Sequence, residues 1–526
     1  MPDELLLRGG TVVDGSGAPP IRADVLIAAG RVVTIDTRCR STRPRTGVEL
    51  DCHGLHVLPG FVDAHSHADF TLPTAPHAGG LLRQGVTTVV TGNCGFSPFP
   101  VSQAGDPLPT GRFLNPDLTG GWPDLTGYAA GLAAAGIRVN VAPLVGHGSV
   151  RAVATGAHDA ADPRHAGLIR REIGRALNQG AFGVSLGLAY PDGRDADPAE
   201  LVDIAALTAA AGGVLAVHLR DERAGCVDAV DEIVELARRT AVATQISHLK
   251  AMGRANWGST RTTLAQVDQA RAAGLDVTVD MYPYTCGATT LTAALPDWAD
   301  SGGPAAVRRL VVEPTARARL LRELAAGAGY IGLDEVVVSH ASSRWRPVIG
   351  RHLAAAAADL DTTPQALLLD ILADDADQAT MLVDAMAADD VDRVLAHPAA
   401  IVGSDGWVIE PTPGAHPRNF ATFVRTLLAA GRHPGRLADA VRRQSAAVAD
   451  RFQLPGRGRV TEGAWADLVV VDVDALRDDG AATGTPPAGI RQVFVNGVAS
   501  YGELLATASR PAGRVLRREP SRRRPR

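Results

Sequence analysis

The segment GFVDAHSH, residues 60–67, indicates the fold. It is a short apolar strand that ends in His65 and His67, and alternate residues of a strand point to the same side, so both imidazoles can reach one metal ion. Seven further short apolar runs end in polar or unusual residues, at 91–94, 145–147, 186–188, 218–220, 248–250, 282–283 and 404–405. Eight strands of this kind predict a barrel whose active site lies at the carboxyl ends of the strands.

Helical patterns rich in Ala, Leu and Arg separate these apolar runs, which is typical of βα units and a parallel sheet. The fold class we predict is α/β, a (β/α)₈ TIM-like barrel over residues 61–450. More than a hundred residues separate the seventh strand from the eighth, too many for one loop and one helix. We therefore expect an inserted subdomain within residues 286–350.

Both chain ends have the texture of hairpin strands, with Gly and Asp-Gly signals between short apolar runs. The examples are LLLRGGTVVDGSG (5–17) and ADVLIAAGRVVTID (23–36) near the start, and AWADLVVVDV (464–473) and IRQVFVNGV (490–498) near the end. We predict that residues 1–60 and 451–520 together build one small β-sandwich. The Arg-rich tail, residues 514–526, is expected to be a solvated terminus.

The composition is that of a soluble globular protein with a sizeable core, since 46% of the 526 residues are hydrophobic and 21% are charged. The net charge of −5 carries no basic run outside the tail, which argues against nucleic acid as a partner. Five cysteines without regular spacing favour a reducing compartment. Neither a signal peptide nor a stretch of ~20 apolar residues is apparent, so we predict a cytoplasmic protein that does not bind membranes.

Metal-ligating residue types recur at the predicted strand ends. His218 lies in VLAVHLRDE at the end of the fifth predicted strand, and His248 lies in ATQISHLK at the end of the sixth. Asp405 lies in AIVGSDG at the end of the eighth. Taken singly, each histidine is as compatible with a hydrogen-bonded core position, and Asp405 with a helix cap. Four histidines and one aspartate at the same end of a barrel together predict a metal site made of His65, His67, His218, His248 and Asp405.

A binuclear site needs an anionic bridge, which in this fold is usually a carboxylated lysine on the fourth strand. That strand, GVSLGLAY (183–190), contains no lysine. Cys94, in VVTGNCG at the end of the second strand, is the candidate replacement, because a thiolate is a soft anionic ligand for Zn²⁺. The alternative is that Cys94 is a small buried side chain.

Lys250 is the single lysine among the 52 basic residues, so an ammonium is expected to be required there. With Tyr282 in DMYPY and Arg418 in HPRNF, it is predicted to bind a substrate carboxylate. For Tyr282 and Arg418, packing and structural ion pairing remain alternatives. Asp405 lies beside the expected water and is predicted to be the catalytic acid and base. Supporting roles near the site are expected for His147, Arg220 and Glu222.

Over nearly its whole length the sequence resembles the D-aminoacylase branch of the metal-dependent amidohydrolase superfamily. TGNCG (91–95) and SHLK (247–250) are the specific motifs, beside GFVDAHSHAD, VGHGSVR, SLGLAYPDG, HLRDE, DMYPYTCGATT, GSDG and the C-terminal GAWADLVVVD and VFVNG. The resemblance implies one tight zinc at Cys94, His218 and His248. It also implies a second, weaker position at His65, His67 and Asp405, and a substrate carboxylate held by Lys250, Tyr282 and Arg418.

The predicted function is therefore zinc-dependent hydrolysis of the amide bond of N-acyl-D-amino acids. A cyclic amidase of the hydantoinase or dihydroorotase type is the alternative, disfavoured by the absence of a lysine on the fourth strand. A scaffold that has lost its metal is a further alternative, disfavoured because all six ligand positions are filled. The acyl group, the preferred side chain, the number of metals bound and the oligomeric state are left open by the sequence.

Overall fold

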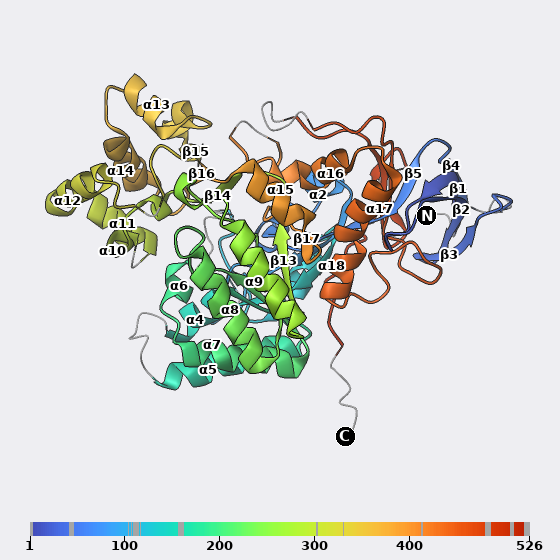
Figure 1. The fold of residues 1–526 in the computed structure, drawn as a ribbon, viewed down its shortest axis with the longest axis horizontal. Helices are drawn as coiled ribbons and strands as arrows, with labels where there is room; N and C mark the ends of the chain where they lie inside the picture. Colours follow the sequence, from blue (N-terminus) through green and yellow to red (C-terminus); the bar gives the residue numbers. More distant parts are fainter. Residues whose placement is uncertain are drawn as a thin grey trace.

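The computed structural model describes residues 4–41, 47–103, 105, 106, 108, 115, 117–155, 163–300, 303–329, 331–411, 414–478, 485–504 and 510–519. Its centre is an α/β unit of parallel strands with helices packed around them (Figure 1). A sheet from both chain ends lies on one side of this unit, and a mainly helical segment lies on the other (Figure 1).

The parallel strands form two sheets, with the order β6-β7-β8 in one and β17-β13-β12-β11-β10-β9 in the other. Their bounds are β6 Phe61–Asp63, β7 Val86–Thr91, β8 Asn140–Pro143, β9 Val145–Gly146, β10 Gly183–Gly187, β11 Val214–His218, β12 Ala243–Ile246, β13 Val277–Met281 and β17 Ala400–Val402. Only Leu144 separates β8 from β9. At the other edge, the Ala64 amide donates to the Val402 carbonyl and the Asp405 amide to the His65 carbonyl, so β6 lies beside β17.

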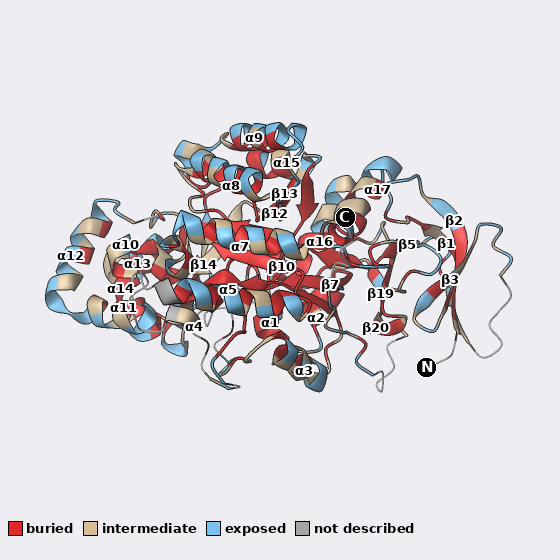
Figure 2. Cartoon of the chain, turned by 90° about the horizontal axis from the view of Figure 1, so that it is seen from below, coloured by how far each residue is buried: buried red, intermediate tan, exposed pale blue. Residues whose placement is uncertain are grey.

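These strands are buried on both faces, as parallel strands covered by helices must be (Figure 2). All six residues of β7, VTTVVT, are buried, and so are all five of β11, VLAVH. β-Branched residues suit this position because their stiff side chains pack well on a pleated surface. The carboxyl ends of the strands consequently meet in one region, and polar side chains placed there are brought together.

The helices around the strands show two features that their sequences predict, an apolar face and capped ends. α8 turns Ala229, Val230, Ile233 and Val234 toward the strands. α7 begins with the Asp197 carboxylate accepting from the Ala199 amide and ends at Gly212, whose φ of 71° is in the left-handed region. The bounds are α1 Ala68–Thr71, α2 Gly79–Leu82, α3 Leu125–Ala135, α4 His147–Thr155, α5 Pro163–Asn178, α6 Pro191–Arg194, α7 Pro198–Ala211, α8 Cys226–Thr240, η2 Arg254–Asn256, α9 Thr260–Ala272, α15 Ala388–Ala396, α16 Arg418–Ala430, α17 Pro434–Arg443 and α18 Ala446–Arg451.

The chain between β13 and α15 forms an antiparallel sheet of order β14-β16-β15 with its own helices. Its elements are β14 Cys286–Thr290, η3 Leu291–Ala294, α10 Asp297–Asp300, α11 Gly303–Val312, α12 Pro314–Ala325, β15 Val336–His340, η4 Ser343–Val348, α13 Leu353–Asp359, α14 Pro364–Asp375 and β16 Thr380–Asp384. We call residues 286–384 the inserted segment. It extends beyond residue 350, the predicted end of the insertion, because β14 pairs with β16.

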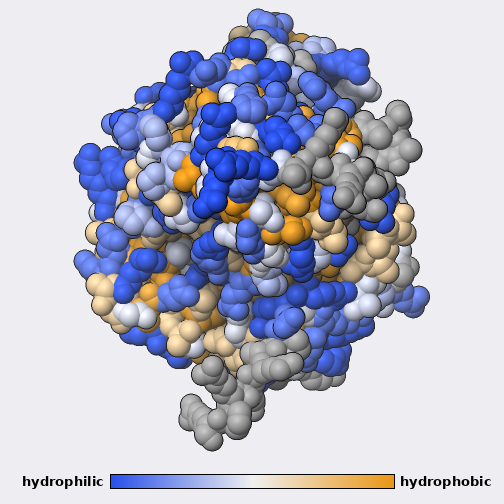
Figure 3. All heavy atoms as spheres, turned by 90° about the vertical axis from the view of Figure 1, so that its right-hand side faces the viewer, coloured by the Kyte–Doolittle hydropathy of each residue, from blue (hydrophilic) through white to orange (hydrophobic). Residues whose placement is uncertain are grey.

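Both chain ends contribute to one eight-stranded sheet. Its strands are β1 Glu4–Val12, β2 Ile21–Ala28, β3 Arg31–Asp36, β4 Val48–Asp51, β5 His56–Pro59, β18 Leu468–Val471, β19 Ile490–Val495 and β20 Val498–Gly502. Leu7, Val25, Val57, Leu468 and Phe494 belong to its own apolar core. On the outer side of this sheet, hydrophilic side chains cover most of the visible face, with apolar residues between them (Figure 3).

The expectation of a solvated tail is wrong for its first residues. Val141 donates to the Arg514 carbonyl and accepts from the Leu516 amide, and the Arg518 amide donates to the Gly180 carbonyl. The segment therefore lies against the amino ends of β8 and β10, where it pairs with backbone groups of Val141 and Gly180. The rest of the predicted tail, 520–526, lies outside the described residues. Across the described parts of the chain, no helix has the length and apolar character needed to cross a membrane.

Candidate metal centre

All six predicted metal ligands lie together at the carboxyl ends of the parallel strands, in two groups that share Cys94. One group contains His65, His67, Cys94 and Asp405, the other Cys94, His218 and His248, and the ligand atoms within each group lie within 4.8 Å of one another. The Cys94 sulfur is 3.3 Å from His65 Nε2 and 3.4 Å from His248 Nε2. The shared thiol occupies the place where a bridging anion is needed.

Three of these ligands have a backbone conformation that side-chain-bearing residues rarely adopt. The φ angles are +54° at Cys94, +32° at His248 and +53° at Asp405, all in the left-handed region. Such strain costs on the order of 1–3 kcal/mol per residue and is found mainly at functional sites. Each of the three lies two or three residues beyond the end of a strand, so the turn there aims the side chain across the strand ends.

The electrostatics of the cluster favour two anions. Burial opposes ionisation of the Cys94 thiol, but the charges of His65 and His248 outweigh it and hold the pKa of Cys94 well below its ordinary value. Burial also opposes the charge on Asp405, and Arg418 and His248 hold the pKa of this carboxyl well below its ordinary value. A buried thiolate and a buried carboxylate require positive charge beside them, which protonated imidazoles or a divalent cation can supply.

Two buried carboxylates stand behind the histidines. Asp280 Oδ1 lies 3.3 Å from His65 Nδ1 and accepts from the His248 amide at 2.8 Å. Glu222 Oε1 lies 3.0 Å from His248 Nδ1. A carboxylate on the far nitrogen of a metal-ligating imidazole fixes its tautomer and orientation. Glu222 was expected in a supporting role, whereas Asp280, within DMYPY, was not among the predicted site residues.

The predicted substrate-binding residues surround the same region, and two of them already have partners. Lys250 Nζ donates to Glu222 Oε1 at 2.7 Å and lies 2.8 Å from His248 Nδ1. Arg418 Nη1 donates to Asp405 Oδ2 at 2.7 Å, and its guanidinium lies 5.2 Å from the Tyr282 ring centre. The Tyr282 hydroxyl is buried and has no hydrogen-bond partner among the described residues. Burial, opposed by Lys250, raises the pKa of Tyr282 to about 12, so the hydroxyl is a donor.

The other two residues with expected supporting roles lie farther out. His147 Nε2 contacts Glu200 Oε1 at 2.6 Å. Arg220 pairs with Glu232 at 2.8 Å and donates to the Arg194 carbonyl at 2.6 Å. Both tie the strand ends to neighbouring helices, which restrains the loops around the metal ligands.

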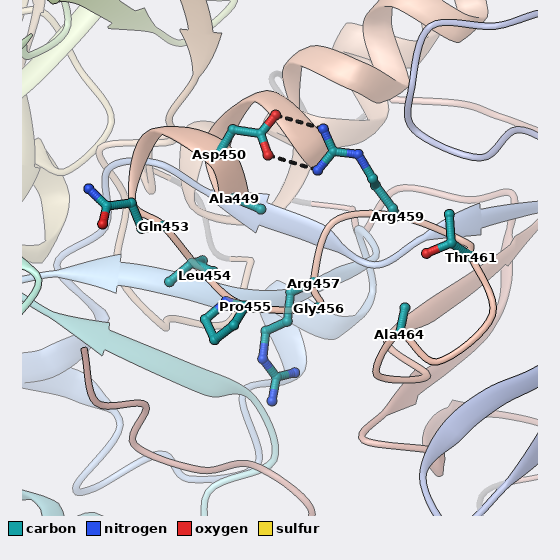
Figure 4. A pocket seen from close by; sticks show the side chains of 10 residues that line it. All are labelled: Ala449, Asp450, Gln453, Leu454, Pro455, Gly456, Arg457, Arg459, Thr461 and Ala464. Atoms are coloured by element: carbon teal, nitrogen blue, oxygen red, sulfur yellow. Dashed lines mark hydrogen bonds and ion pairs between the residues drawn. The ribbon is translucent and has the colours of Figure 1, made fainter. Parts of the chain in front are cut away.

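A surface pocket between α18 and the loop before β18 lies at the opposite end of the strands (Figure 4). The side chain of Gln453, which lines it, donates to the Gly212 carbonyl just before β11 begins. Its polar residues pair with each other: Asp450 and Arg459 form two bonds of 2.8 and 2.6 Å (Figure 4). The pocket brings no metal-ligating group together, so the chemistry belongs to the cluster at the carboxyl ends.

The donor set fits a zinc ion. Thiolate sulfur, imidazole nitrogen and carboxylate oxygen are its ordinary ligands, and three protein ligands beside an open position are typical of catalytic sites. The ring nitrogen His218 Nδ1 is buried without a hydrogen-bond partner in the described structure. Such orphaned nitrogens are costly unless a partner supplies the missing interaction.

Comparison with known proteins agrees with this donor set. The sequence profile of the amidohydrolase family matches residues 48–501, which is most of the chain. The chain belongs to the amidohydrolase family. This amidohydrolase is 36% identical to an N-acyl-D-glutamate deacylase of Alcaligenes xylosoxydans xylosoxydans, over 98% of this chain and 97% of the other. It is 34% identical to a D-aminoacylase of the same organism, with 98% of both chains covered.

Comparison with solved structures also finds N-acyl-D-amino-acid deacylases. The amidohydrolase superimposes on the N-acyl-D-glutamate deacylase of Bordetella bronchiseptica with a TM-score of 0.82 and 31% identity, covering 98% of this chain and 100% of the other. That deacylase was solved in complex with zinc and a phosphonate inhibitor that mimics the tetrahedral intermediate. An L-hydantoinase of Arthrobacter aurescens reaches a TM-score of 0.52 at 16% identity, covering 98% of this chain and 100% of the other, which is a likeness of fold alone.

Proposed function

We propose that this amidohydrolase uses zinc to hydrolyse the amide bond of N-acyl-D-amino acids, giving a carboxylate and a free D-amino acid. The observation that carries the proposal is the Cys94 thiol shared by two metal-ligating groups. The relatives of known activity with 34–36% identity over nearly the full length act on N-acyl-D-amino acids. We assign the tight zinc to Cys94, His218 and His248 and a weaker position to His65, His67 and Asp405.

The proposal includes a domain arrangement. The two parallel sheets form one (β/α)₈ barrel within residues 61–450, supported by the short step from β8 to β9 and by the bonds from β6 to β17. Residues 1–60 and 451–520 form a small β-sandwich, and the inserted segment is a subdomain above the strand ends. We further propose a cytoplasmic protein with a small-molecule substrate and no nucleic-acid or membrane partner.

The reaction follows from the residues around the cluster. A bound zinc ion lowers the pKa of a water toward ~7 and polarises a carbonyl. Asp405 accepts a proton from the attacking water as its oxygen bonds to the amide carbon. The same carboxyl then gives that proton to the departing nitrogen as the C–N bond breaks, because an amine leaves poorly unless protonated. Arg418, 2.7 Å from Asp405 Oδ2, keeps this carboxyl ionised before the reaction.

Substrate binding uses donors on the same side of the cluster. The Tyr282 hydroxyl has no protein partner in the described structure, and Lys250 has three protons of which Glu222 takes one. Together with Arg418 they hold the α-carboxylate. With the amide held at the metal ligands, two substituents of Cα are fixed, and the space left for the side chain selects the hand. We therefore expect turnover of the D-enantiomer and near exclusion of the L-enantiomer.

The test is a substrate panel of N-acetyl-D- and N-acetyl-L-amino acids beside hydantoin and dihydroorotate, with metal content measured on the same sample. The proposal expects hydrolysis of the D-series and close to one tightly held zinc per chain. Equal turnover of both hands, or preference for the cyclic amides, would contradict it. The cyclic-amidase alternative is disfavoured because the residues of β10, Gly183–Gly187, contain no lysine.

A further inference from the structure

His416 lies between the inserted segment and the helix that carries Arg418. Its side chain is 2% exposed. The Tyr282 and Tyr284 rings lie 5.9 and 5.4 Å away and stand nearly perpendicular to it, at 77° and 84°. Edge-to-face packing on two sides holds the ring plane. The two ring nitrogens therefore face fixed directions.

Both nitrogens meet backbone groups. His416 Nδ1 accepts from the Arg418 amide at 3.0 Å, and Nε2 lies 2.8 Å from the Cys286 carbonyl oxygen. An amide can only donate, so Nδ1 carries no proton, and Nε2 must carry the proton that it donates to Cys286. The imidazole is thus the neutral Nε2–H tautomer. Burial and the charge of Arg418 lower the pKa of His416 to about 3, so the ring stays neutral at working pH.

The two partners of His416 belong to different parts of the fold. Cys286 begins β14, the edge strand of the inserted segment. Arg418 begins α16, and its amide is one of the donors that a helix start leaves without an internal partner. The Asn419 side chain also donates to the His416 carbonyl, at 3.0 Å. His416 therefore satisfies a helix start and a strand edge with one side chain.

This bridge continues to the catalytic carboxylate. Arg418 Nη1 donates to Asp405 Oδ2 at 2.7 Å, and Nη2 lies 3.5 Å from the Ala288 carbonyl, two residues along β14 from Cys286. The backbone of Arg418 is held by His416, and its guanidinium spans from Asp405 to the inserted segment. Displacement of β14 would consequently move Arg418 relative to Asp405.

We infer that His416 is a positioning residue that fixes Arg418 against the edge strand of the inserted segment, so that the segment sets the geometry of the Arg418–Asp405 pair. The part of this inference that concerns turnover rests on the proposed function. The part that concerns the position of Arg418 relative to Asp405 does not depend on turnover, because Asp405 is also a ligand of the weaker metal position, where zinc binding can be measured directly.

The experiment compares His416→Phe, which keeps a ring between the tyrosines but removes both hydrogen bonds, with His416→Asn, whose side-chain oxygen can still accept near the position of Nδ1. His397→Phe is the matched control: His397 Nδ1 also accepts from the amide two residues ahead, at 3.2 Å, but at the amino end of β17. We expect His416→Phe to lower kcat/KM by at least ~10-fold and His416→Asn to recover part of the loss, with the control unchanged.

A double-variant cycle separates positioning from a general structural effect. If His416 acts through Arg418, adding His416→Phe to Arg418→Lys costs little more than Arg418→Lys alone. Fully multiplicative losses would overturn the inference. Should His416→Phe fail to fold, His416→Asn takes its place in the same cycle, and circular dichroism decides which variant is used.

Zinc titration gives a readout that does not need turnover. A guanidinium and a cation compete for the Asp405 carboxylate, so a loosened Arg418 should let the second zinc bind at least ~3-fold more tightly in His416→Phe, with the first zinc unchanged. An unchanged second affinity would overturn the inference even in an active enzyme. If the wild type hydrolyses no N-acyl-D-amino acid, the proposed function fails, and this titration alone still decides the role of His416.

Discussion

Glu222 offers a sharp test of how the tight metal position is supported. Its Oε1 atom accepts from Lys250 Nζ at 2.7 Å and lies 3.0 Å from His248 Nδ1, and the side chain is 6% exposed. Burial opposes the charge on Glu222, but Lys250 and His218 outweigh it and hold the pKa of this carboxyl far below its ordinary value. Glu222→Gln keeps the shape and removes the charge.

The size of the effect follows from these contacts. A hydrogen bond to a charged group contributes ~1.5–3 kcal/mol. In Glu222→Gln the amide oxygen can still accept from Lys250 and His248, but both contacts lose the negative charge that strengthens them. We expect unfolding to cost about 3 kcal/mol less, since Lys250 also loses its buried counter-charge. Loss of the carboxylate behind His248 should weaken zinc binding by ~10–100-fold.

The assays are urea unfolding of the zinc-loaded protein and zinc competition with a chelator. Glu232→Gln is the control, because Glu232 pairs with Arg220 at 2.8 Å but both side chains are about one-third exposed, where such a pair is worth at most ~1 kcal/mol. If Glu222→Gln and Glu232→Gln change zinc affinity and stability equally, the carboxylate does not support the metal position.

Cys94→Ala should lose the tight zinc on dialysis, measured as metal content, and full retention would remove Cys94 from the ligands. Asp405→Asn should lower kcat by ~10²–10⁴ while that zinc remains bound; a kcat within threefold of wild type assigns the proton transfer elsewhere. Lys250→Arg should lower kcat/KM at least ~10-fold because a guanidinium differs in shape and reach, and normal kinetics would make the sole lysine a compositional accident. Burial opposes the charge on Glu200, but the hydrogen bond to His147 outweighs it and lowers the pKa of this carboxyl. The ionised carboxylate therefore stabilises the folded protein fully above pH ~4.5, and this stabilisation is lost as the pH falls through the folded-state pKa. The difference in unfolding free energy between wild type and Glu200→Gln should shrink over that range, and a difference that stays constant would contradict the assignment.

The strand ends could be predicted because the local sequence determines them. A β-branched or apolar run followed by His or Cys predicts both the strand and the polar side chain near its carboxyl end, and the structure places the ligand atoms of Cys94, His218 and His248 close together. The family resemblance added the proposed division into a tight and a weak position. Local patterns were sufficient here because the carboxyl ends of neighbouring parallel strands lie at the same edge of the sheet.

Long-range pairing was not accessible in the same way. Nothing within DMYPY shows that Asp280 accepts from the His248 amide, because that bond depends on the register of β12 against β13. The docking of Arg514–Arg518 on the amino ends of β8 and β10 uses backbone groups, which carry no sequence signal. The pairing of β14 with β16, beyond the predicted end of the insertion at residue 350, joins residues far apart in the chain and has no local signal either.

The sheet of chain ends has a consequence for the synthesis of the protein. Pro59 of β5 pairs with Leu468 of β18, so about 410 residues must be made before this strand gains its partner. At ~5–20 residues per second, the wait is roughly 20–80 s, during which β5 has an unpaired edge next to an incomplete apolar core. A nascent chain that stops before β18 keeps that edge exposed, which makes it a target for chaperones and proteases.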